Sequence, residues 1–375
     1  MQNIFFSSGL AFLITFFSIP VIIKVAKDKK LFDEPEERKI HKEVIPTLGG
    51  LGIFAGFIIA TLMGIPPSEI SPLQYFLAAF MLIFFMGIKD DILILTAGKK
   101  FIGQLIAAGI IIKFGGIEIK DMYGILGVHS LTPSASFLIT LFTIVVITNS
   151  FNLIDGVDGL AGSLGLLTTL LFGTYFYFSE QILFAVMALS LAGALSAFLI
   201  YNFHPAKIFM GDTGSLLIGL VNSILVIQFI NTASSPNALF PVQSAPAIGF
   251  AILLVPLFDT LRVVGLRLLS RRSPFSPDRN HIHHFLLDLG FSHRMIALSC
   301  VFTNILFIVM AYFLRSVGTP VLLIVMVSTA ILLVSIIYYN RPKKKIVVTN
   351  GRLREETLLG THKIITLSQE PAEQH

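Results

Sequence analysis

Two adjacent carboxylates mark the first polar segment in which chemistry could take place. Asp90 and Asp91 follow Gly87 at the end of a long apolar run. Like charges are costly to bring together at a membrane surface unless a cation or a substrate offsets their repulsion. The pair is therefore either the solvated start of a loop or part of an active site, and both interpretations stay open.

A second polar segment carries acids and amides but no basic residue. It runs from Asn149 to Gly162 and includes Asn152, Asp155 and Asp158. The two Asp are three residues apart, so a helical turn places them on one face. The glycines of the segment allow the backbone to approach a ligand closely. Capping of the next helix would explain one Asp but not the second Asp or the Asn residues, so we interpret the segment as functional.

Asp212 is the acidic residue of a third segment, Phe209–Ser215, which reads Phe-Met-Gly-Asp-Thr-Gly-Ser. It stands where a helix is expected to begin, so capping that helix is its simplest role. A carboxylate beside glycines at a helix N-terminus also suits a hard divalent cation shared with a phosphate. Asn202 and His204 lie a few residues upstream, on the same side of the predicted topology.

Histidines dominate a fourth segment, in which His281, His283 and His284 fall within four residues. A zinc site is one interpretation, but the one cysteine of the chain lies in an apolar run and the other motifs supply oxygen ligands. A phosphate-binding surface is favoured because three arginines share the loop: Arg271, Arg272 and Arg279. A merely solvated basic loop would explain the arginines but not the histidines.

A fifth segment combines basic residues with a glycine-rich turn. His41 and Lys42 precede Thr47 and the pair Gly49-Gly50. Such a turn could hold a phosphate or a nucleoside, although membrane topology alone also predicts basic residues at this face.

These five segments together contain carboxylates for a hard cation and basic groups for anions. Phosphoryl transfer needs both, because a metal ion neutralises the pyrophosphate and Arg, Lys or His stabilises the charge that develops as the bond breaks. The residues therefore predict a Mg²⁺-dependent enzyme acting on phosphates.

The elements that position these segments must lie in lipid. Of the 375 residues, 54% are hydrophobic and only 13% are charged, whereas an ordinary soluble protein carries roughly 25% charged residues. A bilayer core needs about 20 apolar residues per helix. The apolar runs predict an all-α polytopic membrane protein with about eleven spans, near 4–25, 48–64, 73–88, 102–114, 134–149, 159–178, 182–201, 214–230, 246–266, 294–314 and 319–339.

Basic residues decide the orientation of these spans. With the N-terminus outside and the C-terminus inside, the segments between spans place 21 Lys and Arg inside and only Lys120 and Arg315 outside. The positive-inside rule therefore predicts this orientation. All five polar segments then lie at the cytoplasmic face, and the active site is expected there.

Two segments lie outside the helical pattern. Residues 115–133 alternate weakly around a central glycine, which predicts a small external hairpin. We expect residues 1–340 to form the transmembrane catalytic domain and 341–375 a polar cytoplasmic tail, whose lysines would lie near anionic lipid headgroups.

The motifs, their order and their placement closely resemble the polyprenyl-phosphate N-acetylhexosamine-1-phosphate transferase family over residues 1–340. The resemblance rests on KDD at the third span, NLIDGVDGLAG, FMGDTGS and HIHH. It implies transfer of a sugar 1-phosphate from a UDP-N-acetylhexosamine to undecaprenyl phosphate, with release of UMP. Mg²⁺ is the implied cofactor, with Mn²⁺ as a substitute, and the implied location is the bacterial inner membrane.

Residue roles follow from the resemblance, motif by motif. Catalytic roles are implied for Asp90, Asp91, Asp155, His281, His283 and His284. Metal binding is implied for Asp212 and Asp155. Substrate binding is implied for Lys42, Thr47, Lys100, Asn149, Asn152, Asp158, Asn202, Phe209 and Arg279. The chain is compatible with a homodimer among membrane lipids, and no nucleic-acid partner is expected.

The histidine motif also indicates a branch of the family. The branch that uses the muramoyl-pentapeptide nucleotide typically has three consecutive histidines followed by Phe-Glu, whereas this chain has HIHHF followed by Leu. The motif thus resembles the branch that starts O-antigen, teichoic acid or arabinogalactan, and N-acetylglucosamine is the expected sugar. A transporter of phosphorylated metabolites is the alternative of another class, but transporters usually carry charged groups deep in their spans and internal repeats.

Overall fold

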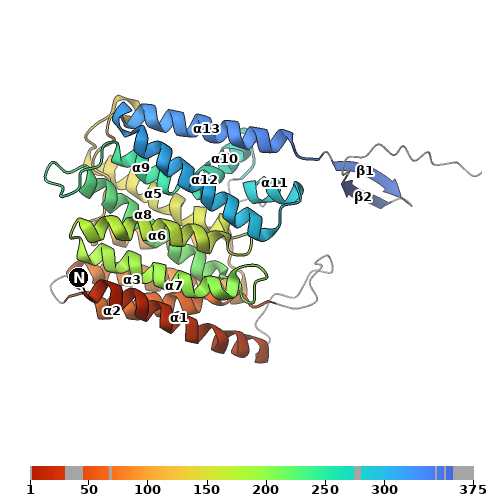
Figure 1. Ribbon diagram of the computed structural model, residues 1–375, viewed down its shortest axis with the longest axis horizontal. Helices are drawn as coiled ribbons and strands as arrows, with labels where there is room; N and C mark the ends of the chain where they lie inside the picture. Colours follow the sequence, from red (N-terminus) through yellow and green to blue (C-terminus); the bar gives the residue numbers. More distant parts are fainter. Residues whose placement is uncertain are drawn as a thin grey trace, which may run out of the picture.

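The computed structural model describes residues 2–29, 45–66, 70–273, 280–342, 344–349 and 352–357. Its long helices lie side by side in one bundle, with α1 and α2 at one edge and α13 at the other (Figure 1). The helices are α1 Gln2–Asp28, α2 Gly49–Gly64, α3 Ile70–Leu93, α4 Ala97–Lys113, α5 Pro133–Ile154, α6 Leu160–Phe178, α7 Ile182–Asn202, α8 Gly211–Ala233, α9 Ala245–Ile252, α10 Leu254–Leu269, α11 Ile282–Asp288, α12 His293–Phe313 and α13 Thr319–Tyr339.

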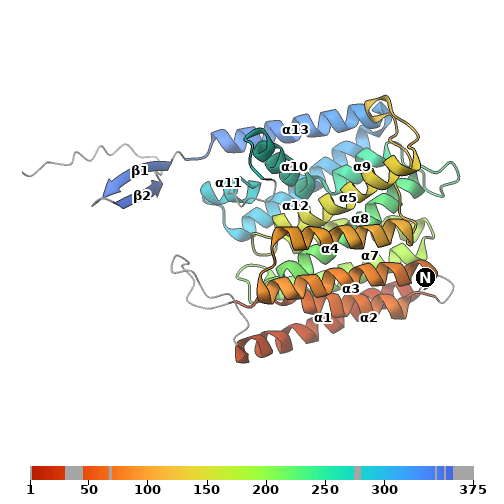
Figure 2. The ribbon, with the colours of Figure 1, turned by 180° about the vertical axis from the view of Figure 1, so that it is seen from behind.

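Helix α8 is the centre of the bundle. It is buried over most of its length and packs against α2, α3, α5 and α6, whereas α1 and α13 are largely exposed. Figure 2 shows α3, α4 and α5 covering the side that is hidden in Figure 1. Apolar segments in lipid must satisfy their backbone hydrogen bonds internally, which explains why these runs form helices.

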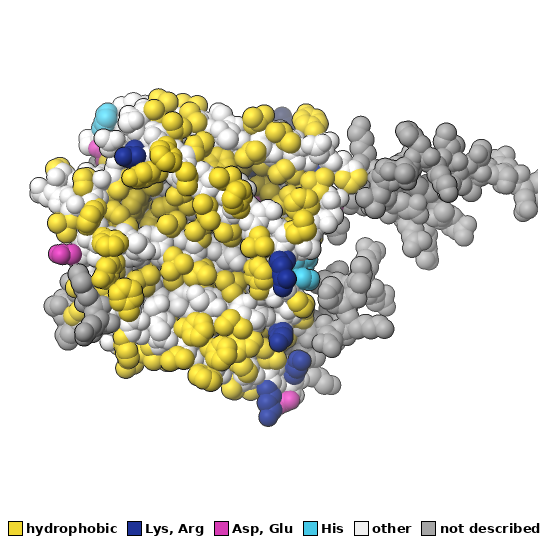
Figure 3. Space-filling model, viewed as in Figure 1, with side chains coloured by type: hydrophobic (Ala, Val, Ile, Leu, Met, Phe, Trp, Pro, Cys, Tyr) yellow, Lys and Arg dark blue, Asp and Glu magenta, His cyan; other side chains and the backbone are white. Residues whose placement is uncertain are grey.

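The side chains agree with an integral membrane protein. Hydrophobic side chains cover the middle of the visible face, while Lys and Arg gather mainly at one end of the bundle (Figure 3). Among the described residues, seven helices are long and apolar enough to cross a membrane, or eight if the bent pair α9–α10 is one span. The polytopic helical class is confirmed, and the count of eleven spans stays a prediction.

The predicted span 246–266 is not one straight helix. Helices α9 and α10 meet at an angle of 84°. Asn304 of α12, which is fully buried, satisfies the backbone at the break: its Oδ1 accepts from Val255 N at 3.0 Å and its Nδ2 donates to Ile252 O at 2.9 Å. Because a side chain from another helix replaces the missing helical bonds, the chain can bend inside an apolar run.

Short β structure occurs at two places. In the predicted hairpin, Asp121 and Ser130 form a bridge around the 3₁₀ turn Ile125–Gly127, so the hairpin geometry is confirmed. Beyond α13, strands β1 (Lys344–Thr349) and β2 (Arg352–Thr357) pair antiparallel. The all-helical prediction therefore holds for the bundle but missed this small sheet in the tail.

Candidate active site

The predicted acidic pair meets the N-terminus of α8, where each carboxylate has a different partner. Asp91 Oδ1 accepts from Asp212 N at 2.7 Å, and its Oδ2 accepts from the N and Oγ1 of Thr213 at 3.1 and 2.5 Å. These are donors that a helix N-terminus leaves without intrahelical partners. Asp91, which belongs to α3, thus caps the N-terminus of α8.

Asp212 itself does not cap α8, contrary to its simplest predicted role. The residue before α8 is Met210, and Asp212 lies in the first turn. Its Oδ2 accepts from Lys100 Nζ at 2.6 Å, and the same ammonium forms an ion pair with Asp90. Lys100 therefore links both carboxylates, and its role in substrate binding stays a prediction.

The glycine-rich turn before α2 is joined to the segment before α8. Gly49 N donates to Phe209 O at 2.9 Å, and Gly50 N donates to Met210 O at 2.8 Å. These two amides are therefore already hydrogen-bonded. They are not available to a phosphate, which the glycine-rich turn alone had suggested they could bind. The approach is so close that a Cβ at Gly50 would lie 2.3 Å from Gly214 N.

The end of α5 and the following loop bring the second motif beside α8. Asn152 Nδ2 donates to Ser215 Oγ of α8 at 3.0 Å. Asn149 instead pairs with Gln104 of α4, its Nδ2 donating to Gln104 Oε1 at 2.6 Å. Among the described residues, no hydrogen bond or ion pair reaches the carboxylate of Asp155, which ends α5.

A polar pocket of about 320 Å³ joins these segments. Burial and the neighbouring carboxylates of Asp212, Asp91 and Asp158 raise the pKa of Asp155 well above its usual value. An unpaired carboxylate among other acids calls for a cation, so the pocket can hold one. Its lining includes Thr47, Asn152, Asp155, Asp158, Asn202, Phe209, Asp212, Ser215 and His293.

Asn202 and Asp158 tie the rim of the pocket together. Asn202 Oδ1 accepts from Gly159 N and its Nδ2 donates to Ile208 O, both at 2.9 Å. Asp158 Oδ2 lies 2.8 Å from His204 Nδ1, and its Oδ1 lies 3.2 Å from His293 Nδ1. Asn202 therefore positions the loop after α5, and Asp158 is held between two imidazoles.

The histidine motif reaches the same loop from short helix α11. His281 and His283 are both buried. A Cβ at Gly156 would lie 2.5 Å from His283 Nε2, so this glycine admits the imidazole. Burial first, and then the nearby His284, lowers the pKa of His283 to about 4. His283 is thus neutral at physiological pH, and His284 is the more exposed of the pair.

Asp259 of α10 orients this motif and was not among the predicted residues. It is buried, and its Oδ2 lies 2.9 Å from His281 Nδ1. Its Oδ1 accepts from Ile282 N at 3.0 Å and from Arg262 Nη2 at 2.9 Å. A charged residue inside an apolar run was the available signal for Asp259. His293 offered none, since it is a lone histidine at a helix start.

The structure thus brings most of the predicted residues to one end of the bundle. Lys42 and Arg279 lie outside the described residues, so their roles stay predictions. Asn149 is close by but pairs with α4 and does not line the polar pocket.

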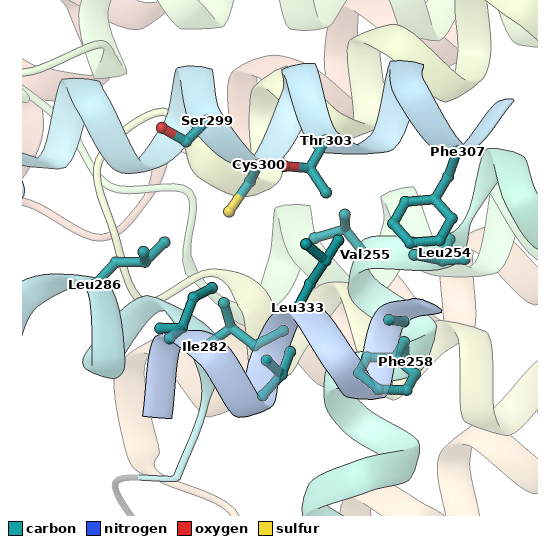
Figure 4. A pocket seen from close by; sticks show the side chains of 13 residues that line it. Leu254, Val255, Phe258, Ile282, Leu286, Ser299, Cys300, Thr303, Phe307 and Leu333 are labelled. Atoms are coloured by element: carbon teal, nitrogen blue, oxygen red, sulfur yellow. The ribbon is translucent and has the colours of Figure 1, made fainter. Parts of the chain in front are cut away.

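A second, apolar cavity lies between α10, α11, α12 and α13 (Figure 4). It measures about 140 Å³ and is lined almost entirely by aliphatic and aromatic side chains, with Cys300 and Thr303 projecting toward it from α12. Such a lining suits hydrocarbon and not a nucleotide. The polar and apolar cavities therefore separate two kinds of ligand chemistry.

Comparison with known proteins agrees with this geometry. The model of glycosyl transferase family 4 matches residues 73–230, which include both acidic motifs and the start of α8. A Bacillus subtilis protein named "Probable undecaprenyl-phosphate N-acetylglucosaminyl 1-phosphate transferase" is 34% identical over 316 residues, covering 82% of this chain and 85% of the relative.

Two further relatives come from other bacterial groups. A decaprenyl-phosphate N-acetylglucosaminephosphotransferase of Mycobacterium tuberculosis is 35% identical, over 77% of this chain and 76% of the relative. The undecaprenyl-phosphate alpha-N-acetylglucosaminyl 1-phosphate transferase of Escherichia coli K12 is 31% identical, over 72% and 73%. With its acidic, glycine and histidine motifs gathered around one pocket, this chain belongs to glycosyl transferase family 4, among the polyprenyl-phosphate N-acetylhexosamine-1-phosphate transferases.

Proposed function

We propose that this protein transfers N-acetylglucosamine 1-phosphate from UDP-N-acetylglucosamine to undecaprenyl phosphate, as the first membrane step of a cell-surface polysaccharide. The names of its relatives support this substrate class. An oxygen of the lipid phosphate attacks the phosphorus that carries the sugar, the bond between the two phosphates of the donor breaks, and UMP leaves. The product is a lipid-linked sugar diphosphate.

The observation that carries the proposal is that Asp155 and Asp212 line one pocket, while Lys100 forms an ion pair with Asp212. The donor set fits Mg²⁺, which prefers carboxylate and other oxygen ligands. Asp155 and Asp212 would hold the ion, with Asn152 and Ser215 at hand as neutral oxygen donors. A bound Mg²⁺ would supply charge neutralisation for the diphosphate of the donor.

The residues around that position have separate tasks. Lys100, ion-paired with Asp90 and Asp212, holds the two carboxylates together and adds a positive charge for a phosphate. Asp91 fixes the start of α8, and with it the direction of the Asp212 side chain. Phe209 and Asp158 line the far part of the pocket and would bind the nucleoside.

The proposal places the pocket at the cytoplasmic face of a bacterial inner membrane. The segments between spans that are predicted to lie inside hold most of the Lys and Arg residues, which supports this orientation. UDP-sugars are soluble, so a donor pocket facing the cytoplasm suits the substrate. The apolar cavity bordered by α10 and α13 lies within the bundle, where prenyl chains would be found.

A radiolabel assay tests the proposal. Purified full-length protein in detergent, with undecaprenyl phosphate and Mg²⁺, is offered labelled UDP-N-acetylglucosamine or labelled UDP-N-acetylmuramoyl-pentapeptide. Labelled lipid is expected only from the first donor, together with one UMP per transfer. Labelled lipid from the pentapeptide donor alone would assign the chain to the peptidoglycan branch instead.

A further inference from the structure

Three metal-binding side chains from distant parts of the sequence converge at the rim of the polar pocket. Asp158 lies in the loop after α5, His204 follows α7, and His293 is the first residue of α12. Their donor atoms all lie within 4.8 Å of one another. Asp158 Oδ2 is 2.8 Å from His204 Nδ1, and Asp158 Oδ1 is 3.2 Å from His293 Nδ1.

We propose that Asp158, His204 and His293 form a second cation site, for a divalent ion of the zinc class, distinct from the oxygen-donor position at Asp155 and Asp212. Two imidazoles and one carboxylate are the ligand set of open zinc sites, in which water takes the fourth place. Mg²⁺ prefers oxygen ligands, so the two positions select different ions.

The geometry needs only small side-chain movements to close on an ion. Zinc bonds to nitrogen and carboxylate oxygen are about 2.0–2.2 Å long, which makes the edge of a tetrahedron roughly 3.3 Å. The two carboxylate oxygens of Asp158 lie 2.8 and 3.2 Å from the imidazole nitrogens of His204 and His293, which is near that edge. The side chains of His204 and His293 are 36% and 34% exposed, so a hydrated ion can reach them from solvent.

One ligand atom of the cluster, His293 Nδ1, has no hydrogen bond within the described residues. His293 Nδ1 is buried, and no atom of the described residues forms a hydrogen bond with it, although Asp158 Oδ1 lies nearby. A buried ring nitrogen without a partner is unfavourable. In the neutral tautomer protonated at Nε2, Nδ1 carries a lone pair that can bind an ion.

Neighbouring contacts hold the two imidazoles close together before any ion arrives, with their ring centroids 5.1 Å apart. Arg294, the residue after His293, donates from Nη2 to His204 O at 3.2 Å and lies over the ring of Phe203. Ala206 N donates to Asp158 Oδ2 at 3.3 Å. The start of α12 and the segment after α7 are thereby clamped together, so an ion would bind with little reorganisation.

An ion at this site would also act on the enzyme. Asp158 and His293 line the pocket in which the nucleoside of the donor is proposed to bind. Zinc bound there would occupy the Asp158 carboxylate and therefore compete with the UDP-sugar. This consequence rests on the proposed function, whereas the cation site itself does not.

Cobalt spectroscopy tests the site without using activity. Full-length protein purified in detergent without a polyhistidine tag is titrated with Co²⁺, whose visible absorption reports coordination by nitrogen and oxygen ligands. We expect one Co²⁺ per chain, displaced by Zn²⁺ but not by millimolar Mg²⁺. His204→Gln and His293→Gln should each weaken Co²⁺ binding by more than about tenfold, because even outer-shell changes cost that much.

Two comparisons decide the outcome. His129→Gln, in the hairpin at the other end of the bundle, should leave the Co²⁺ spectrum unchanged. Circular dichroism and the thermal midpoint identify any variant that fails to fold, and Asp158→Asn then serves as a third ligand variant. Absence of Co²⁺ binding by folded wild type, or equal binding by wild type and His293→Gln, would overturn the site.

The competitive effect is measured separately. Zn²⁺ should raise the apparent KM for the UDP-sugar in wild type more strongly than in His204→Gln, with Mg²⁺ held constant. If the chain binds Co²⁺ through these residues but transfers no sugar phosphate, the proposed function fails and the cation site stands. If transfer occurs but Co²⁺ does not bind, the reverse holds.

Discussion

At the scale of single residues, Asp155 is the most unfavourably placed charge of the pocket. Its carboxylate has no hydrogen-bond or ion-pair partner among the described residues, and burial first, then the acids around it, raises its pKa well above the usual value. Burying a charge without a partner is destabilising. Such a residue is retained for what it binds, which is the argument for a cation here.

Substitution of Asp155 separates binding from stability. Asp155→Asn removes the repelled charge, so we expect a higher thermal midpoint than wild type when Mg²⁺ is chelated. The same variant should lose the rise in midpoint that Mg²⁺ gives wild type, and transfer should fall by orders of magnitude. Thermal unfolding in detergent with and without Mg²⁺ measures both midpoint effects, and a transfer assay measures the rate. An unchanged response of the midpoint to Mg²⁺ would remove Asp155 from the cation site.

His283 predicts a pH dependence of stability. Its pKa is about 4 in the folded protein, against an ordinary value near 6.5, because burial disfavours the charged imidazole. The unfolded chain therefore binds a proton first as pH falls, and the stability present above pH 6.5 is lost progressively down to pH 4. The loss of unfolding free energy below pH 4 is about 3 kcal/mol, at roughly 1.4 kcal/mol per pKa unit.

The matched variant is His283→Gln, which cannot titrate. Between pH 7 and pH 5 its thermal midpoint should fall less than that of wild type. His129→Gln, in the hairpin at the other end of the bundle, serves as the control and should follow wild type. Equal pH slopes for wild type and His283→Gln would show that the imidazole of His283 is not held neutral.

At the scale of elements, the contact between α3 and α8 sets the position of the site. Gly87 lies one turn before Asp91, and a Cβ there would lie 2.5 Å from Thr213 Cα, a backbone atom that cannot move aside easily. Small residues commonly allow such close approach between membrane helices. Asp91 can therefore reach the first amides of α8 only because Gly87 brings the two helices together.

Gly87→Ala tests this dependence. The added methyl should force α3 away from α8 and withdraw the Asp91 cap, which lowers both the thermal midpoint and the transfer rate. Overpacking of this kind typically costs about 2 kcal/mol of unfolding free energy. Gly98→Ala in α4 is the matched control, since a Cβ there would meet no atom within 4 Å. Comparable losses in both variants would mean that the effect comes from folding in lipid and not from this contact, because alanine has the higher helix propensity at both positions.

The cap itself is tested by Asp91→Asn beside Asp90→Asn. An amide offers one accepting oxygen to three donors, so Asp91→Asn should cost about 1–3 kcal/mol of unfolding free energy. Asp90→Asn leaves these donors satisfied and should cost less, while Lys100 keeps Asp212 as a partner. Denaturant titration compares the two; a larger loss for Asp90→Asn would contradict the cap.

The sequence predicts elements well where the signal is local and poorly where it is distant. Apolar runs gave the positions of the long helices, because lipid-facing backbone can pair only within its own segment. The bend at Leu253 depends on Asn304, which lies about fifty positions further along the chain. The pairing of Asp259 with His281, and of His293 with Asp158, likewise joins residues that no local pattern connects.

At the scale of the whole molecule, one end of the bundle carries the chemistry. The N-terminal ends of α2, α8 and α12 meet the C-terminal ends of α3, α5 and α7 around the polar pocket. Motifs far apart in sequence could be grouped before the structure because alternate loops of a polytopic protein share one face. Their individual hydrogen bonds could not be predicted, since each depends on how neighbouring helices pack.

The orientation of that end is the remaining prediction. The predicted spans place 21 Lys and Arg in segments on the inside and only Lys120 and Arg315 on the outside. In a background in which the one cysteine, buried Cys300, is changed to alanine, two exposed loop positions report the topology. Asn237→Cys should react with a membrane-impermeant maleimide in intact cells, because the loop after α8 is expected outside. Lys207→Cys, in the segment before α8, should react only after the membrane is permeabilised.

Transfer activity of both variants confirms that the labelled protein is folded. The reverse labelling pattern would place the pocket outside and remove the cytoplasmic supply of donor on which the proposed reaction depends.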